Sequence, residues 1–215
     1  MRKTGWLALI AALAAAAVLQ GCVPVAVVGI GAAVTAGNDR RTSGAQIEDE
    51  GIELRASNRI SERWGDRIHI NVTSYNRNVL LSGEVADEAT KGQVEKLVAA
   101  QPNVRGITND IAVAGVAALS ARANDAYLTS KVKARFVDAQ RFNPFHVKVV
   151  TENSTVYLIG IVTAEEANEA TEIARTTGGV RKVVRLFEYC KLTEDVCRPP
   201  GETKGSAPKA DAKQK

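Results

Sequence analysis

Two stretches of the chain repeat one pattern of apolar and polar positions. Ile70–Ala89 and Val147–Glu166 each begin with alternating apolar and polar residues and then pass through a short polar segment. Each returns to an apolar run that holds a glycine, Gly83 in the first stretch and Gly160 in the second. Alternation with a period of two is typical of a β-strand, and a polar segment between two such runs is typical of a turn. Each stretch therefore predicts two antiparallel strands joined by a tight turn.

A helix and one more strand follow each of these hairpins. Asp87 and Thr163 are residues suited to cap the start of a helix, and each precedes a segment with helical character. The predicted helices span 88–100 and 164–176, and the predicted closing strands span 103–113 and 179–189. Because the closing strand enters the sheet through a crossover, we expect a mixed sheet in each copy.

Each copy is also preceded by an amphipathic helix with one apolar residue per turn. The apolar stripes are Ile52, Ala56, Ile60 and Trp64 in the first copy and Leu128, Val132 and Phe136 in the second. This spacing places the apolar residues on one side of a helix. Each unit thus predicts the order αββαβ, with a small three-stranded mixed sheet packed on two helices. The expected fold class is α+β, built from two tandem modules.

The repeat and the flanking composition divide the chain into six segments. We expect a signal peptide, a lipidated cysteine with a linker, a first module, a connector, a second module, and a mostly disordered extension rich in Pro, Lys and Ala. Their predicted bounds are 1–21, 22–45, 46–114, 115–123, 124–191 and 192–215.

The N-terminal segment has the features of an export signal. Arg2 and Lys3 precede an apolar, Ala-rich run over Trp6–Leu19, which is too short to cross a bilayer comfortably. The run ends in "LQGC", which resembles the lipobox of bacterial lipoproteins. That resemblance implies cleavage before Cys22 and acylation of its thiol and of the new N-terminus. The residue after the cysteine is Val23 rather than Asp, which by the sorting rule of such lipoproteins implies a periplasm-facing anchor in the outer membrane.

Charge gives no reason to expect a nucleic acid partner. The formal net charge is +4, but the signal peptide and the C-terminal tail each carry two of these charges. The body of the protein is therefore near neutral, and only a local charge asymmetry can be informative.

Two cysteines remain after Cys22. Cys190 and Cys197 lie seven residues apart and would both be exported to an oxidising compartment. We expect a disulfide between them, with two free thiols as the alternative. No histidine or further cysteine lies near them, so a metal site is not expected.

The sequence offers few candidates for catalysis. His69 and His146 stand at matched positions, one residue before the first strand of each hairpin. The repeat explains both as strand-entry positions on separate modules, and Arg105 and Arg181 likewise precede the last strand of each copy. We find no nucleophile with a base, no phosphate-binding loop and no carboxylate pair, so neither enzyme activity nor a metal or cofactor is expected.

The repeated unit resembles the BON domain, a bacterial envelope module of about this size with the order αββαβ. The matching landmarks are the glycines Gly83 and Gly160 and the "VRGI" and "VRKV" entries to the last strands. The segments "DRRTSGAQIED", "INVTSYN", "TSKV" and "VKVVTENSTVYLIGIVT" further resemble a group of outer-membrane lipoproteins that carry two BON domains. The resemblance covers nearly all of the chain from Cys22 to about Lys191, and it leaves out both late cysteines.

The resemblance implies a binding protein rather than an enzyme. In that group the second BON domain binds anionic phospholipid, of the phosphatidylglycerol or cardiolipin type, through its first helix, and the protein supports outer-membrane integrity at the division site. Carried onto this chain, the contact residues would be Tyr127, Leu128, Lys131, Lys133 and Arg135. Tyr127 stands where the group has tryptophan, which partitions more strongly into a membrane interface. The alternative function is an adaptor that binds proteins of envelope or outer-membrane assembly.

The repeat offers an internal control for this helix. The apolar stripes are aligned as Ala56 with Leu128, Ile60 with Val132 and Trp64 with Phe136. This alignment places Arg55 opposite Tyr127 and Arg59 opposite Lys131, so the fold does not require an aromatic residue at Tyr127. The segment 127–137 carries three cations and no acid. An exposed aromatic beside cations suits a lipid headgroup region, whereas the plainer interpretation is a solvated helix face.

Overall fold

The computed structural model describes residues 39–197 of the 215-residue chain. The chain divides into two units after Asn38, and all described residues belong to the second. The predicted signal peptide, Cys22, most of the linker and residues 198–215 lie outside the described residues.

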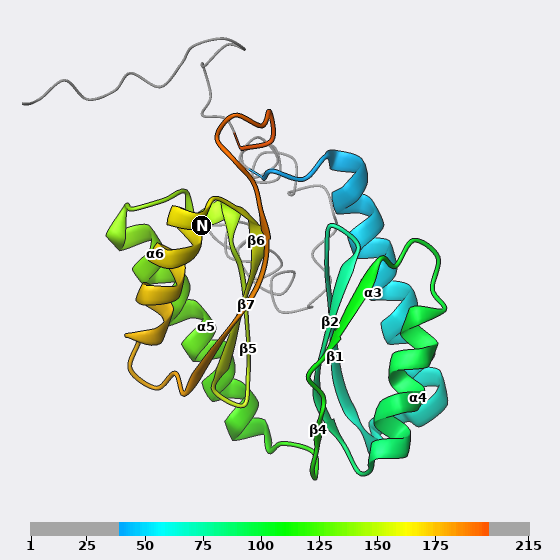
Figure 1. The fold of residues 1–215 in the computed structure, drawn as a ribbon. Helices are drawn as coiled ribbons and strands as arrows, with labels where there is room; N and C mark the ends of the chain where they lie inside the picture. The colour runs from blue at the N-terminus through cyan, green and yellow to red at the C-terminus, as the bar shows by residue number, and fades with distance from the viewer. Residues whose placement is uncertain (1–38, 198–215) are drawn as a thin grey trace, which may run out of the picture. The chain divides into compact units, whose positions relative to one another are not determined.

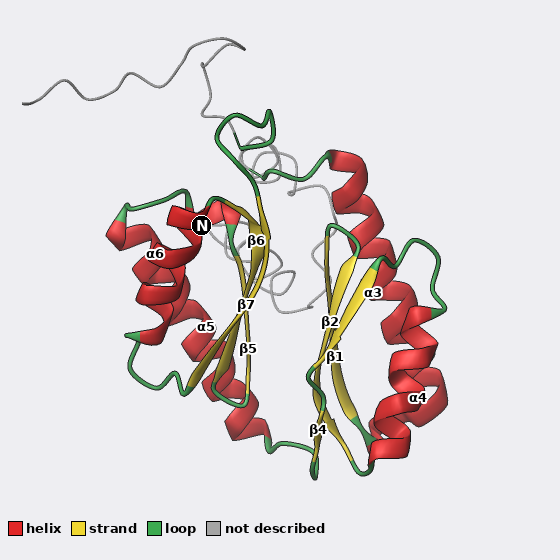
Figure 2. Ribbon diagram, viewed as in Figure 1, coloured by secondary structure: helices red, strands yellow, loops and turns green. Residues whose placement is uncertain are grey.

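The first module contains two helices and a small mixed sheet (Figures 1 and 2). Helices α3 and α4 lie on the same face of this sheet (Figure 1). The elements are α3 (Ser43–Trp64), the short 3-10 helix η2 (Gly65–Arg67), β1 (His69–Tyr75), β2 (Asn78–Val85), α4 (Glu88–Ala99), β3 (Gly106–Asn109) and β4 (Ala112–Val113).

The second module repeats this arrangement. Helices α5 and α6 lie on one face of its three-stranded sheet (Figure 2). Its elements are α5 (Leu119–Ala139), η3 (Pro144–His146), β5 (Lys148–Glu152), β6 (Thr155–Val162), α6 (Ala164–Arg175) and β7 (Lys182–Tyr189).

Both sheets are mixed, as the sequence predicted. In each module the hairpin strands are antiparallel, and the closing strand pairs in parallel with the second hairpin strand, which lies at the centre. The α+β class and the two tandem αββαβ modules are therefore confirmed.

The closing strand of the first module differs from the prediction. It is broken into β3 and β4, both parallel to β2, so this sheet has four strands instead of three. The break falls at Asp110 and Ile111. The Ile111 N–H donates to the Asn109 side chain rather than to a neighbouring strand, and the Asp110 carboxylate accepts a 2.7 Å hydrogen bond from the Tyr157 hydroxyl of the second module. The bond between Ile111 and Asn109 is local, and local side-chain bonds of this kind compete with the strand ladder.

Helix α5 begins earlier than expected. The sequence predicted that the second module begins at residue 124, but the helix starts at Leu119, inside the predicted connector. Residues 119–123 include two alanines and continue a helix well, so residue 124 lies about one and a half turns inside it.

The side chain of Asp125 is used to hold the adjacent hairpin instead of capping the helix. Its two carboxylate oxygens accept the N–H groups of Asn153 and Ser154, each at 2.8 Å, in the turn between β5 and β6. Both turn residues have positive φ, as the tight turn of a two-residue hairpin requires. Asp49 on α3 does the same for the turn at Asn76 and Arg77 in the first module.

The buried aspartates show that the sequence alignment of the two helices was wrong by one turn. The buried residues are Asp49, Ile52, Ala56 and Ile60 on α3 and Asp125, Leu128, Val132 and Phe136 on α5. Ile52 therefore matches Leu128, and Trp64 belongs to an additional turn of α3. A one-turn shift preserves the apolar period, so the pattern alone could not detect it.

Gly83 and Gly160 keep their repeated places because two backbones approach closely there. A Cβ atom on Gly83 would lie 2.1 Å from the carbonyl oxygen of His69, and one on Gly160 would lie 2.2 Å from that of His146. No side chain fits at either position without moving the neighbouring backbone.

The faces of the two sheets that point away from the helices pack together. Apolar side chains from both modules form one buried cluster there, including Tyr75 and Leu80 from the first and Tyr157 and Ile159 from the second. Both central strands are therefore buried on both faces, which explains their nearly continuous apolar runs.

Candidate functional site

Tyr127 and Lys131 form the centre of the predicted contact surface on α5. The Tyr127 side chain is 62 % exposed and projects from the helix without a hydrogen-bond partner among the described residues. The Lys131 ammonium lies 5.9 Å from the centroid of the Tyr127 ring and donates a 3.0 Å hydrogen bond to the carbonyl of Gly178. The two residues therefore present an aromatic ring and a cation side by side.

Arg135 continues this flank but has a structural role. Its Nη1 atom donates to the carbonyl of Ile173 at 2.8 Å and to the hydroxyls of Thr176 and Thr177 at the end of α6. A guanidinium at this position donates hydrogen bonds to the last carbonyl groups of α6, and the negative end of the helix dipole stabilises its positive charge. Arg135 can add charge to the surface, but its geometry is already fixed by α6.

Lys133 lies on the other side of the buried stripe. It lines a cavity of about 340 Å³ together with Val137, Phe145 and Lys148. Val137 and Phe145 are both exposed. The structure therefore does not bring the predicted cations into one patch, and it reveals a second basic and apolar flank. Sequence reasoning missed Phe145, although the "NPF" turn that presents it is visible in the sequence.

Leu128 is a correction to the predicted site. Its side chain is 2 % exposed and packs beneath the surface of α5, close to Gly179. It occupies the position of Ile52 in the first module and belongs to the core, so it is not available to a membrane or a partner.

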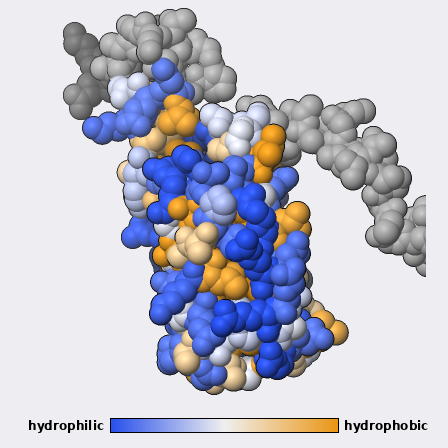
Figure 3. Space-filling view, turned by 90° about the vertical axis from the view of Figure 1, so that its right-hand side faces the viewer, coloured by the Kyte–Doolittle hydropathy of each residue, from blue (hydrophilic) through white to orange (hydrophobic). Residues whose placement is uncertain are grey.

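The corrected alignment also changes the internal control. Gly51, not Arg55, stands opposite Tyr127, and Arg55 stands opposite Lys131. The sibling helix thus has no side chain where Tyr127 projects, and its Arg55 is occupied by an ion pair with Glu48 at 2.8 Å. The surface around α3 and α4 is mainly hydrophilic, with separate hydrophobic patches (Figure 3).

Cys190 and Cys197 are joined by a disulfide with their Cα atoms 6.1 Å apart. Both residues are buried and belong to the apolar cluster between the two sheets. The disulfide therefore holds the segment after β7 against the interface between the two modules.

The two histidines at matched positions have different surroundings. His146 lies 2.9 Å from Glu166, which also accepts hydrogen bonds from Arg40 and from the N–H of Thr163 at the cap of α6. Burial alone would raise the pKa of the Glu166 carboxyl, but the hydrogen bonds from His146, Arg40 and Thr163 outweigh burial and lower this pKa to about 2. His69 lies instead near two buried carboxylates, one of them from the second module.

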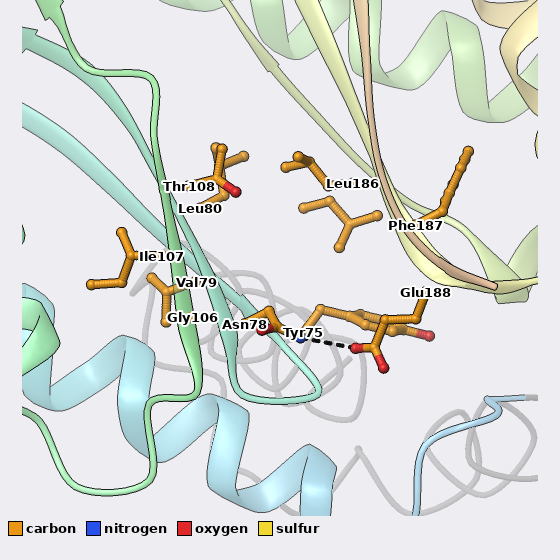
Figure 4. A pocket seen from close by; sticks show the side chains of 11 residues that line it. Tyr75, Asn78, Val79, Leu80, Gly106, Ile107, Thr108, Leu186, Phe187 and Glu188 are labelled. Atoms are coloured by element: carbon orange, nitrogen blue, oxygen red, sulfur yellow. Dashed lines mark hydrogen bonds between the residues drawn. The ribbon is translucent and has the colours of Figure 1, made fainter.

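A further cavity, of about 260 Å³, lies between the modules at the ends of their sheets (Figure 4). Leu80 and Thr108 of the first module and Leu186 of the second border it, and the Asn78 amide donates to Glu188 across it at 2.9 Å. Edge strands β3 and β7 both reach this space.

Among residues 39–197, no helix combines the length and the apolar character that a membrane span needs.

Comparison with known proteins identifies the class of this molecule. The BON-domain family model matches residues 48–115 and again 124–191. The chain therefore belongs to the BON-domain family and carries two copies of the domain, which confirms the resemblance found in the sequence.

Relatives extend the similarity over most of the chain. The chain is 35% identical over 180 residues to the outer membrane lipoprotein DolP of Haemophilus influenzae, covering 82% of this chain and 93% of that protein. It is 31% identical over 153 residues to a 21 kDa hemolysin of Actinobacillus pleuropneumoniae, covering 70% and 79%. These similarities support the interpretation of the chain as an outer-membrane lipoprotein with BON domains.

A solved structure, the C-terminal domain of CdsD from the type III secretion system of Chlamydia trachomatis, is also similar. It shares 11% identity, covers 64% of this chain and 97% of that one, and has a TM-score of 0.27.

Proposed function

We propose that this protein is a non-enzymatic lipoprotein, anchored at Cys22 in the outer membrane and facing the periplasm. In this proposal, its second BON domain binds anionic phospholipid through the exposed flank of α5, and the protein supports outer-membrane integrity, at the division site. The observation that carries the proposal is the exposed Tyr127 ring beside the Lys131 ammonium, on a helix whose sibling has a glycine at that place.

The physics of the surface favours a weak, tether-assisted contact. An amphipathic ring is stable at the level of lipid headgroups, and each Lys or Arg near an anionic surface contributes about 1 kcal/mol. Lys131 and Arg135 together thus contribute about 2 kcal/mol, which is little for a free protein. An acylated Cys22 would raise the effective concentration of the helix at the membrane, so a modest affinity is sufficient.

Sedimentation with vesicles tests this assignment. We expect the full chain, purified in detergent and mixed with preformed phosphatidylglycerol vesicles, to bind more tightly than the double variant Tyr127→Glu/Lys131→Glu, by at least about tenfold. The double variant replaces one attractive charge with two repulsive ones and removes the ring.

A matched control exists on the sibling helix. Leu54 is 63 % exposed, nearly the same as Tyr127, and Arg59 is exposed as well. The variant Leu54→Glu/Arg59→Glu therefore makes the same charge change on α3, and we expect it to keep wild-type binding. Equal loss in both double variants would mean that net charge, not the α5 flank, determines binding.

The alternative proposal is a protein-binding adaptor, and the cavity in Figure 4 favours it. An extended segment of an envelope protein could pair with an edge strand there and place apolar side chains against Leu80 and Leu186. Thr108 is exposed at the rim, so Thr108→Arg would obstruct the cavity. An adaptor that uses this cavity loses its partners in Thr108→Arg and keeps them in Tyr127→Glu/Lys131→Glu.

A further inference from the structure

Two carboxylates and one imidazole meet at the junction of the two modules. The ligand atoms of His69, Glu84 and Glu152 all lie within 4.8 Å of one another. His69 and Glu84 are paired across the β1–β2 ladder, with Nδ1 and Oε2 3.1 Å apart. Glu152 comes from the end of β5 in the second module. The group therefore combines donors from both BON domains.

Both carboxylates are buried. Glu84 is 5 % exposed and Glu152 is 6 % exposed. Within residues 39–197 neither forms an ion pair with a lysine or an arginine, and Arg122, which lines the same cavity as Glu152, reaches neither. Two neighbouring buried carboxylates repel each other and are costly without a compensating charge. One imidazole cannot balance two such charges.

The hydrogen bonds leave one oxygen of each carboxylate open. The N–H of Ala117 and the ring of His69 both approach Oε2 of Glu84, and the Asn71 amide donates to Oε2 of Glu152 at 2.6 Å. Among the described residues no hydrogen bond reaches Oε1 of either carboxylate. Each side chain is thus oriented by one oxygen while the other remains available to a ligand, as in sites where outer hydrogen bonds orient metal ligands.

The surroundings give an ion both space and access. His69 and Glu152 line a cavity of about 430 Å³, with Asp125 also on its wall. The His69 side chain is 18 % exposed, so solvent reaches the group at its ring. Asp125 adds negative charge to the cavity, although its oxygens are bonded to the β5–β6 turn.

We propose that His69, Glu84 and Glu152 form a binding site for a divalent transition metal ion, with Zn²⁺ as the best match, that joins the two BON domains. An imidazole nitrogen with two carboxylate oxygens is a donor set that Zn²⁺ accepts, whereas Ca²⁺ and Mg²⁺ prefer oxygen ligands alone. Ligands about 2.1 Å from a tetrahedral ion are roughly 3.4 Å apart, so small side-chain movements bring the three donors into place. Water completes the coordination from the cavity.

The repeat provides the matched control. His146 holds the same place in the second module as His69 in the first, but its carboxylate partner Glu166 is already paired with Arg40. A bound guanidinium occupies the position that a metal would need. The proposal therefore predicts one site per chain, at His69 and not at His146.

Calorimetric titration with Zn²⁺ tests the site. The full chain, free of any tag, with its disulfide intact, is stripped with a chelator and dialysed before titration. We expect saturation at one Zn²⁺ per chain, a Zn²⁺-dependent rise in the melting temperature, and no competition from Mg²⁺. His69→Asn and Glu152→Gln each weaken binding by at least about tenfold, while His146→Asn binds like the wild type.

Glu152→Gln separates loss of the site from loss of the fold. The substituted amide can still accept the hydrogen bond from Asn71, and it removes one of the two buried charges. We expect this variant to melt at or above the wild-type temperature without metal and to show no Zn²⁺-dependent rise. No saturable binding, binding unchanged in His69→Asn and Glu152→Gln (an adventitious ion only), or binding lost in His146→Asn would each overturn the proposal.

Discussion

Single residues in this protein carry roles that their types alone do not reveal. Asp125 looks like part of a helix start in the sequence, yet it is buried and holds a hairpin turn. Leu128 was expected to contact lipid, yet it lies in the core. Tyr127 is exposed, as expected from the sequence, because the buried stripe of α5 consists of other residues such as Leu128 and Val132. The pattern identifies which face of a helix is apolar, but it does not show which polar residue is buried with that face.

Asp125 offers a direct test of the buried anchor. Asp125→Ala removes the acceptor of two part-buried turn N–H groups, and a hydrogen bond to a charged group contributes about 1.5–3 kcal/mol. We expect the free energy of unfolding to fall by about 3 kcal/mol in urea denaturation. Asp138→Ala, at an exposed place on the same helix, is the control and should change it by less than about 0.5 kcal/mol. Similar values for the two variants would refute the anchor.

Gly160 is a second residue whose role becomes clear only in three dimensions. Gly160→Ala would place a methyl group 2.2 Å from the carbonyl oxygen of His146, so the hairpin must move apart. We expect a loss of several kcal/mol in unfolding free energy, or failure to fold. The control is Gly92→Ala on α4, where a Cβ meets open space and which should be neutral or slightly stabilising. A stable Gly160→Ala variant would contradict the close approach.

Among the elements, the helices and hairpins could be predicted from the sequence because their apolar residues recur at regular helical or strand spacing. The predicted helix 164–176 is observed as Ala164–Arg175, with a capping box formed by Thr163 and Glu166. The break between β3 and β4 was not predicted, because only one of the two bonds seen there, from Ile111 to the Asn109 side chain, is local, whereas the Tyr157 hydroxyl that binds Asp110 comes from the other module. Contacts that are distant in sequence leave no local pattern.

The cap of α6 predicts a dependence of stability on pH. The pKa of Glu166 is lowered to about 2 in the folded protein, below the ordinary value of 4.5. Its charged form therefore stabilises the fold, fully above about pH 5, and this contribution is lost as the pH falls toward 2. We expect the gap in unfolding free energy between wild type and Glu166→Gln to shrink over this range. Denaturation at several pH values measures the gap, and a constant gap would exclude the linkage.

Across the whole molecule, the main feature that sequence reasoning missed is the packing of one module on the other. The apolar runs of β2 and β6 contained the signal, since a strand buried on both faces loses its alternation. Further bonds cross the junction, including the ion pair of Lys148 with Glu53 at 2.9 Å. Arg40, just before the first module, pairs with Glu166 of the second. A junction of this kind is where residues from both domains can share a ligand.

In the proposed function the exposed flank of α5 meets an anionic membrane, and the fluorescence of a tryptophan placed on that flank reports the contact. Tyr127→Trp places an indole on that flank, with Trp64→Phe removing the tryptophan of α3. With phosphatidylglycerol vesicles we predict a blue shift of the emission and tighter binding than the wild type, because indole partitions more strongly than phenol into the interface. With phosphatidylcholine vesicles we predict neither. If the emission does not shift while the chain binds anionic vesicles, the membrane is contacted elsewhere and the α5 flank is not the lipid-binding surface.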